Sequence, residues 1–169
     1  MYILTIIDLQ SFFVKFNTKK FKNIKQNIIR EIKIAKRNSY PIFVVEFSGW
    51  WSDDGQINTL PSIMRPIKNY ENTFIINKYK DDGSEKIDNI ANKYIHTKNI
   101  RILGVNTDAC ILKTVRGLSQ KYYNVQVIAD SCASFWDDNK QKWDTNHKWG
   151  LSKISKINCV KIMRQNGTA

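Results

Sequence analysis

Short apolar segments alternate with amphipathic segments along almost the whole chain, and this alternation limits the folds available to it. Ile3–Ile7 and Ile42–Val45 are apolar at nearly every position, which is typical of buried strands, whereas Phe21–Lys36 carries apolar residues every three or four positions, as a helix does. Ser48–Pro66 has no period, so we expect a long loop with about one helical turn there. The same patterns predict further strands at 73–77, 100–105, 125–129 and 159–163, and further helices at 85–95, 109–121 and 137–154.

Strands without a polar face must be covered on both sides, which favours a parallel sheet between two layers of helices. Right-handed crossovers then give a doubly wound α/β fold, with six mainly parallel strands and helices on both faces. The chain has 169 residues, of which 42% are hydrophobic, and this suits a single domain over residues 1–169. In such folds the ligand site lies at the carboxyl ends of the strands.

Three reactive side chains are expected at that edge. Asp8 directly follows the first strand, Lys78 follows the third, and Cys110 lies just beyond the fourth, in the first turn of a helix. A helix N-terminus and a nearby cation favour a thiolate, and a carboxylate can take up and return a proton. Backbone N–H groups can hold an oxyanion, which is worth about 3 kcal/mol. Taken singly, each residue is more often structural: Asp8 as a cap, Lys78 as a solvated lysine and Cys110 as a small core residue. Their joint placement is more informative than any one of them.

Composition narrows the function classes. The net charge is +12, but the lysines are spread along the chain, so a solvated basic surface is favoured over a nucleic-acid site. His96 and His147 stand far apart, no CxxC or HExxH motif is present, and no metal site is expected. Both histidines are expected to be surface or capping residues. The apolar run at the N-terminus is far too short to span a membrane.

The three cysteines do not form a disulfide framework, because their number is odd and their spacing is wide. This cysteine usage suits a reducing cytosol and predicts a cytoplasmic protein. Cys132 and Cys159 are interpreted as structural residues.

Three segments resemble one known family. Ile6–Phe13 is similar to the hydrophobic-Asp-x-Gln-x-x-Phe opening of the isochorismatase-like cysteine hydrolases. Gly104–Ile111, followed by Thr114, resembles the Gly-x-x-Thr-x-x-Cys-Val-x-x-Thr segment of that family, and this is the most specific match. Val127–Ser134 resembles its following strand, which commonly ends in Asp-Ala-Cys-Ala-Ser. The likeness runs from about residue 2 to residue 163.

This resemblance implies a catalytic triad with Asp8 as general base, Cys110 as nucleophile and Lys78 as the group that orients the pair and stabilises negative charge. Lys80 is the competing lysine, but family lysines lie at the strand end with a serine several residues on, which fits Lys78. The family often has a cis peptide, here between Val105 and Asn106. It would aim the amides of Asn106 and Cys110 at the substrate oxygen.

The chain also departs from the family. Nicotinamidases of this family carry an Asp-x-His metal site after the second strand, whereas Glu46–Trp51 contains no histidine, so no metal or other cofactor is expected. Isochorismatases generally lack the nucleophilic cysteine, so the presence of Cys110 favours cleavage of a C–N bond in a small amide, ureide or imide through a thioester. Phe13, Trp50 and Trp51 are candidates for the pocket wall, although they could equally fill the core or a subunit interface.

Two other functions stay open at this point. One is a catalytically inert or regulatory relative that uses its basic surface to bind an anionic partner. The other is a vinyl-ether hydrolase of the isochorismate type, whose activity would not depend on Cys110. Relatives are commonly oligomeric, so the resemblance also implies a homo-oligomer.

Overall fold

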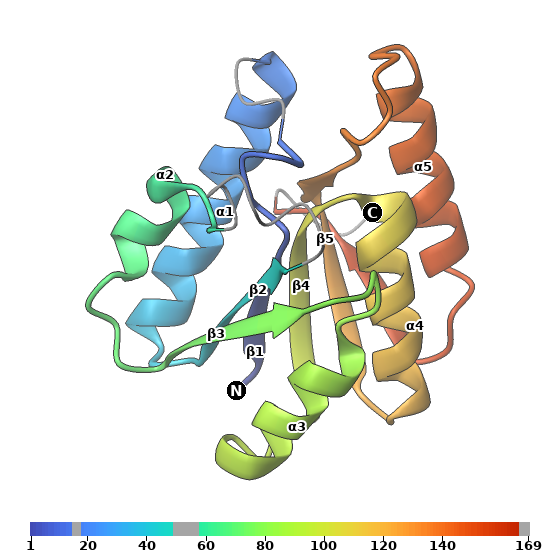
Figure 1. The fold of residues 1–169 in the computed structure, drawn as a ribbon. Coiled ribbons are helices and arrows are strands. Elements are labelled where there is room, and N and C mark those ends of the chain that lie inside the picture. The colour runs from blue at the N-terminus through green and yellow to red at the C-terminus, as the bar shows by residue number, and fades with distance from the viewer. Residues whose placement is uncertain (15–17, 49–57, 166–169) are drawn as a thin grey trace.

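A parallel sheet of six strands forms the centre of the computed structural model, which describes residues 1–14, 18–48 and 58–165 (Figure 1). The strand order is β3-β2-β1-β4-β5-β6, and every neighbouring pair is parallel. This confirms the predicted sheet. The strands are β1 (Ile3–Ile7), β2 (Ile42–Phe47), β3 (Thr73–Lys78), β4 (Asn99–Val105), β5 (Asn124–Ala133) and β6 (Val160–Met163).

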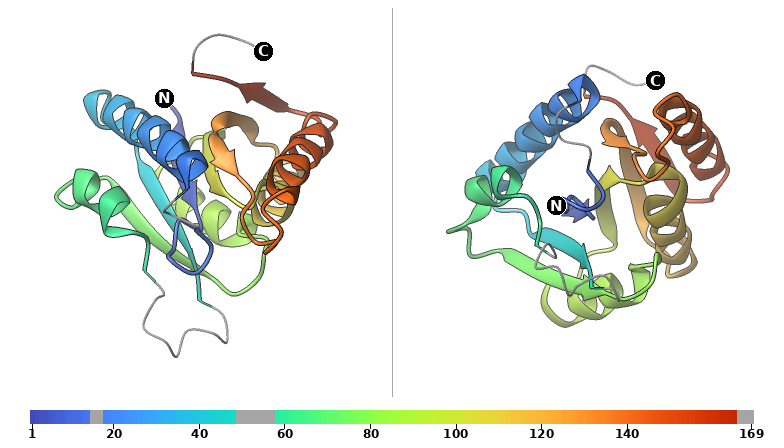
Figure 2. Two further views of the ribbon diagram at one scale, coloured as in Figure 1. Left: turned by 90° about the horizontal axis from the view of Figure 1, so that it is seen from above. Right: turned by 45° about the horizontal axis from the view of Figure 1, so that its top comes forward.

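Helices cover both faces of the sheet, as predicted for a doubly wound fold (Figure 2). They are α1 (Lys19–Arg37), α2 (Pro61–Met64), α3 (Ser84–Tyr94), α4 (Leu112–Gln120) and α5 (Lys142–Ile154), with a 3₁₀-helix η2 (Arg65–Ile67) and a π-helix η3 (Thr107–Ile111). Helices α1 and α2 pack together on one face, and α3, α4 and α5 pack in sequence on the other. Within the described ranges, no helix has both the length and the apolarity needed to cross a membrane.

The longest helix illustrates how the sequence sets an element. Thr18 caps α1, because its hydroxyl accepts a hydrogen bond from the Phe21 amide at 3.1 Å. Lys36 and Arg37 in the last turn interact favourably with the helix dipole. The apolar stripe of α1 is buried against the sheet, and this burial provides most of the stability of such a helix. The stripe comprises Phe21, Ile24, Ile28, Ile32 and Ala35.

Two element boundaries differ from the prediction by four or more residues, those of β5 and α5. Strand β5 continues to Ala133 instead of stopping at residue 129, because a register shift between Ile102 and Gly104 lets its last residues pair with the end of β4. Helix α5 begins at Lys142 instead of residue 137. Asp137 and Asn139 accept hydrogen bonds from backbone amides two residues ahead, and such local bonds compete with a helix.

Gly104 lets the ends of β1 and β4 approach closely. Its φ of +132° lies in a region that side-chain-bearing residues rarely adopt, and a Cβ atom there would lie 2.2 Å from the Ile7 carbonyl oxygen. Gly104 pairs with Ile7, so this contact stands one residue before Asp8 and two before Asn106. The close approach therefore brings the two strand ends together at the edge where the site is expected.

We expect Gly104→Ala to lower the free energy of unfolding by about 3 kcal/mol or more, because it combines backbone strain with a clash against Ile7. Urea unfolding monitored by circular dichroism measures this. Asn99→Ala on the exposed start of the same strand is the control, with a change within about 0.5 kcal/mol. Equal stability of the two variants would contradict the close-packing argument.

Candidate active site at the carboxyl ends of the strands

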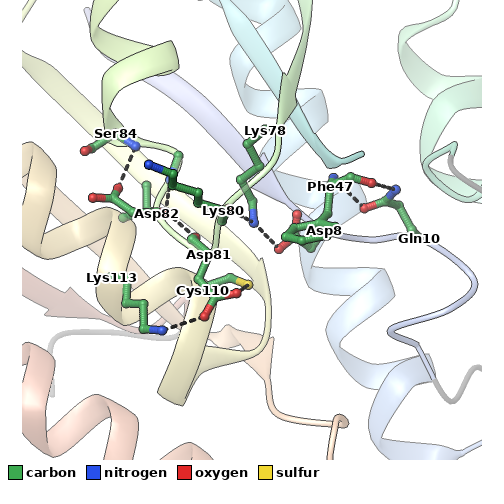
Figure 3. A network of polar contacts seen from close by, with 12 residues as sticks. Asp8, Gln10, Phe47, Lys78, Lys80, Asp81, Asp82, Ser84, Cys110 and Lys113 are labelled. Carbon is green, nitrogen blue, oxygen red and sulfur yellow. Dashed lines mark hydrogen bonds and ion pairs between the residues drawn. The ribbon is translucent and has the colours of Figure 1, made fainter. Parts of the chain in front are cut away.

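The structure brings Asp8, Lys78 and Cys110 together at the carboxyl edge of the sheet (Figure 3). Asp8 follows β1, Lys78 is the last residue of β3, and Cys110 lies in π-helix η3 directly after β4. In the sheet, β1 lies between β2 and β4, and β3 adjoins β2. The parallel order therefore places three segments that are far apart in the sequence at one edge.

A buried ion pair is the centre of this site. Lys78 Nζ lies 2.9 Å from Asp8 Oδ2, and the two side chains are 1% and 0% exposed. The ammonium also donates to the Lys80 carbonyl at 3.1 Å and lies 4.7 Å from the centroid of the Phe47 ring. Lys80 contributes this backbone oxygen, while its own side chain is exposed. The geometry thus pairs Lys78, and not Lys80, with Asp8.

The surroundings of Cys110 favour the protonated thiol over the thiolate. Burial, followed by the negative charge of Asp8, raises the pKa of the Cys110 thiol far above its ordinary value, and the charge of Lys78 offsets only part of this. The expectation that a helix end and a cation would favour the thiolate is therefore wrong here. Burial also raises the pKa of Asp8, against the lowering effect of Lys78.

The thiol lies between two carboxylates. Besides burial, the negative charge of Asp8 is one of the causes that raise the pKa of Cys110. The sulfur also donates to Asp81 Oδ1 at 3.8 Å, and Asp81 Oδ2 accepts from Lys113 at 2.5 Å. Asp81 is not among the predicted site residues, since nothing in the sequence places it against Cys110.

The peptide between Val105 and Asn106 is trans, and the described residues contain no cis peptide bond, so the cis bond implied by the resemblance is wrong. The chain turns instead through a φ of 23° and ψ of 92° at Asn106. A non-proline cis bond costs about 3–4 kcal/mol, whereas asparagine tolerates positive φ better than most residues. The Asn106 side chain accepts from the Phe135 amide at 3.1 Å, and the Asn106 carbonyl accepts from Ala109 and Ile111.

His147 holds the residue that follows this turn. Its Nδ1 lies 2.8 Å from Thr107 Oγ1, so His147 is not the surface residue that the sequence indicated. Burial, followed by the charge of Lys20, lowers the pKa of His147 to about 4, and the ring is neutral near pH 7. Gly150, in the same helix, lets α5 approach Asp108 closely. No sequence signal could join Thr107 to a residue 40 positions away.

Gln10 and two phenylalanines line the side of the site near Lys78. The Gln10 amide donates to the Phe47 carbonyl at 3.0 Å and accepts from the Phe47 N–H at 2.8 Å. Phe13 packs edge-on against Phe47, with 5.9 Å between ring centroids. Phe13 is therefore one ring removed from the Lys78 ammonium. Trp50 and Trp51 lie outside the described residues.

Among residues 1–14, 18–48 and 58–165, no group of three His, Cys, Asp or Glu side chains is arranged to hold a metal ion. A cavity of about 450 Å³ lies where β4, β5 and β6 begin, lined by Asn99, Asn124, Val125, Gln126, Cys159, Val160 and Lys161. It is at the opposite edge of the sheet from Cys110 and is distinct from the site described above.

The sheet order and the Asp–Lys–Cys group together define a three-layer α/β protein with a cysteine-centred site. A family model described as the Isochorismatase domain matches residues 2–156. The chain belongs to the isochorismatase family.

Individual relatives agree with this assignment. The isochorismatase domain-containing protein 2 of Xenopus laevis is 27% identical over 166 residues, covering 98% of this chain and 68% of the relative. The nicotinamidase of Staphylococcus aureus has a similar fold, with a TM-score of 0.75 and 21% identity over 95% of this chain and 96% of the other. The N-carbamoylsarcosine amidase of Thermoplasma acidophilum matches with a TM-score of 0.76 and 15% identity, covering 97% and 96%.

Removing one member of the buried ion pair should destabilise the protein. Lys78→Met leaves the Asp8 carboxylate buried without a counterion, so we expect a loss of about 3–5 kcal/mol in the free energy of unfolding. The double variant Asp8→Asn/Lys78→Met removes both charges and should be more stable than Lys78→Met alone. Urea unfolding near neutral pH measures both.

Lys98→Met, which removes a partly exposed partner of Asp88, is the control and should cost about 1 kcal/mol or less. A double variant less stable than Lys78→Met would contradict the argument that each buried charge requires the other as its counterion.

The burial of His147 should make stability depend on pH. The folded-state pKa of about 4 is below the ordinary histidine value of 6.5, so the unfolded chain binds more protons between these values and stability falls as the pH is lowered through them. The stability advantage of wild type over His147→Gln should shrink by at most about 3 kcal/mol across this range. Thermal unfolding at a series of pH values measures it, and a constant difference would contradict the argument.

Proposed function

We propose that this protein is a cysteine hydrolase that cleaves the C–N bond of a small amide, ureide or imide through a Cys110 thioester. The observation that carries the proposal is the buried Lys78–Asp8 ion pair beside the Cys110 thiol. A thiol whose pKa is raised by burial needs a base at the moment of attack, and a carboxylate whose own pKa is raised by burial is a better base than an exposed one.

In the proposed reaction, Asp8 takes the thiol proton while Cys110 Sγ forms a bond to the substrate carbonyl carbon. The tetrahedral intermediate collapses, the C–N bond breaks, and Asp8 gives its proton to the leaving nitrogen. Asp8 next removes a proton from water, and the water oxygen attacks the thioester carbon. The C–S bond then breaks, Cys110 regains the proton from Asp8, and the carboxylic acid product is released. Lys78 keeps Asp8 oriented and offsets the negative charge that develops beside it.

The backbone N–H groups of Asn106 and Cys110 are proposed to hold the oxyanion. They stand on either side of Thr107 and Asp108 in the turn that His147 and Gly150 pack against. Such a turn is suited to the role because donors fixed before the reaction need no reorganisation when charge develops. Phe13, Trp50 and Trp51 remain the proposed pocket wall, with Phe13 supported by its contact with Phe47.

Family membership supports a hydrolase, and the names of two relatives of similar fold support the bond type. One is a nicotinamidase and the other an N-carbamoylsarcosine amidase. The three cysteines of the chain are free, including the exposed Cys159, which supports a reducing cytoplasmic compartment. We further propose that the protein forms a homo-oligomer and that its substrate is a small molecule.

A screen of small amides, ureides and imides for ammonia release tests the function. We expect wild type to hydrolyse at least one class, and Cys110→Ala and Asp8→Asn to lose on the order of 10³-fold or more in kcat/KM. Cys132→Ala is the matched control, because it removes a buried cysteine from β5 and should retain activity close to wild type. Trapping the acyl group on the Cys110 peptide by mass spectrometry provides an independent readout.

Two outcomes would overturn the proposal. Turnover that survives Cys110→Ala, in particular of a vinyl ether such as isochorismate, would indicate chemistry without a thioester. No turnover in any class, together with salt-sensitive binding of an anionic polymer, would indicate a non-catalytic relative.

A further inference from the structure

Asp81 lies next to the nucleophile, yet the mechanism above gives it no proton to transfer. Its Oδ1 accepts from Cys110 Sγ at 3.8 Å, while its Oδ2 accepts from Lys113 Nζ at 2.5 Å (Figure 3). A carboxylate at this distance from a reacting sulfur influences which chemical groups can reach that sulfur.

The position of Asp81 is fixed by its backbone. The Thr114 hydroxyl donates to the Asp81 carbonyl at 3.4 Å and accepts from the Gly83 amide at 3.0 Å, which ties the loop to α4. The preceding carbonyl, that of Lys80, accepts from Lys78 Nζ at 3.1 Å. The same ammonium that pairs with Asp8 therefore helps to place Asp81.

Asp81 is also the more accessible of the groups around the sulfur. Its side chain is 42% exposed, whereas Cys110 is 5% exposed, so a molecule arriving from solvent contacts Asp81 first. Lys113 occupies Oδ2, and the thiol contact of Oδ1 is long and weak. A substrate N–H group is a stronger donor than a thiol and would replace it at Oδ1.

The same oxygen opposes negative charge. A carboxylate of a substrate seated beside Cys110 would lie within a few ångströms of Asp81 and be repelled. Lys113 reduces this repulsion only in part, because it binds the oxygen farther from the sulfur and is itself 55% exposed to water.

We propose that Asp81 determines specificity: it favours neutral or cationic substrates with an N–H donor next to the reacting carbonyl, such as primary amides and ureides, and disfavours substrates with a carboxylate there. This inference rests on the proposed function for its substrate class. The charge discrimination itself acts on any molecule that reaches Cys110.

Alkylation of Cys110 tests the discrimination without requiring turnover. Iodoacetamide is neutral and iodoacetate is anionic, and both react with the thiolate, so the ratio of their second-order rates does not depend on the thiolate fraction. We expect the ratio at Cys110 to exceed that of a small free thiol under the same conditions. Asp81→Asn should lower it by about three- to tenfold. Peptide mass spectrometry measures the alkylation of Cys110 separately from that of the exposed Cys159.

Asp82→Asn is the matched control. It removes the same charge one residue away, and asparagine retains an oxygen for the hydrogen bond that Asp82 Oδ1 accepts from the Ser84 amide. The ratio of the two alkylation rates should stay within about a factor of two of wild type. Among the contacts of the described residues, none joins Asp82 to the Cys110 sulfur. An Asp81→Asn ratio equal to wild type, or an equal change in Asp82→Asn, overturns the proposal.

The opposite effect on charge selection would follow if Lys113 outweighed Asp81 and attracted anions to the Cys110 sulfur. A wild-type ratio at or below that of the free thiol would favour this alternative and overturn the role of Asp81. The charge-neutral double variant Asp81→Asn/Lys113→Gln separates the two, because our proposal expects its ratio to remain below wild type.

Turnover gives the second arm of the test. Succinamide and succinamate have similar size, but only the second carries a carboxylate. Asp81→Asn should raise kcat/KM for succinamate relative to succinamide by about three- to tenfold, with the change mainly in KM. If wild type hydrolyses no compound of the ammonia-release screen while the alkylation ratios behave as expected, the proposed function fails and the charge discrimination at Cys110 stands.

Discussion

The ion pair between Lys78 and Asp8 is the interaction on which the site depends. Two opposite charges are almost completely removed from water, a state that is tolerated only when each charge has the other within contact distance. The pair also links the ends of β1 and β3, which are separated in the sheet by β2. Because Lys78 additionally bonds to the Lys80 carbonyl and lies against Phe47, its amine has a defined position from which both Asp8 and the following loop are oriented.

Burial gives this site a different starting state from a cysteine at an exposed helix terminus. An exposed terminus with a nearby cation stabilises a thiolate before the substrate arrives. Here burial and the neighbouring carboxylate outweigh the cation, so the thiol keeps its proton and the carboxylate becomes a stronger base. In the mechanism that we propose, charge separation is deferred until the substrate carbonyl is present to accept it. The turn at Asn106 is suited to this, since the Asn106 side chain accepts a hydrogen bond from the Phe135 amide and the hydroxyl of its neighbour Thr107 contacts His147.

The sequence predicted those parts that depend on local pattern. Apolar runs located the strand ends, and the rule that parallel strands end at one edge was enough to place Asp8, Lys78 and Cys110 together. The sequence could not predict the long-range contacts of Asp81 and His147, because each contact depends on which loop or helix packs against η3. The wrong expectation of a thiolate has the same origin, since the depth of burial decides the balance between Lys78 and Asp8 and is not encoded in spacing.

The two lysine–aspartate pairs around Cys110 show how solvent exposure divides similar chemistry into two roles. Asp8 and Lys78 are buried, so their charges act strongly on each other and on the sulfur, and a proton can move between defined partners. Asp81 and Lys113 are partly exposed, so water screens them and their effect on Cys110 is weaker, but an incoming molecule can contact them directly. A proton-transfer group benefits from exclusion of water, whereas a group that selects among substrates must be reachable from it. In our proposal the buried pair serves proton transfer and the partly exposed pair serves substrate selection, so the same two residue types meet both requirements.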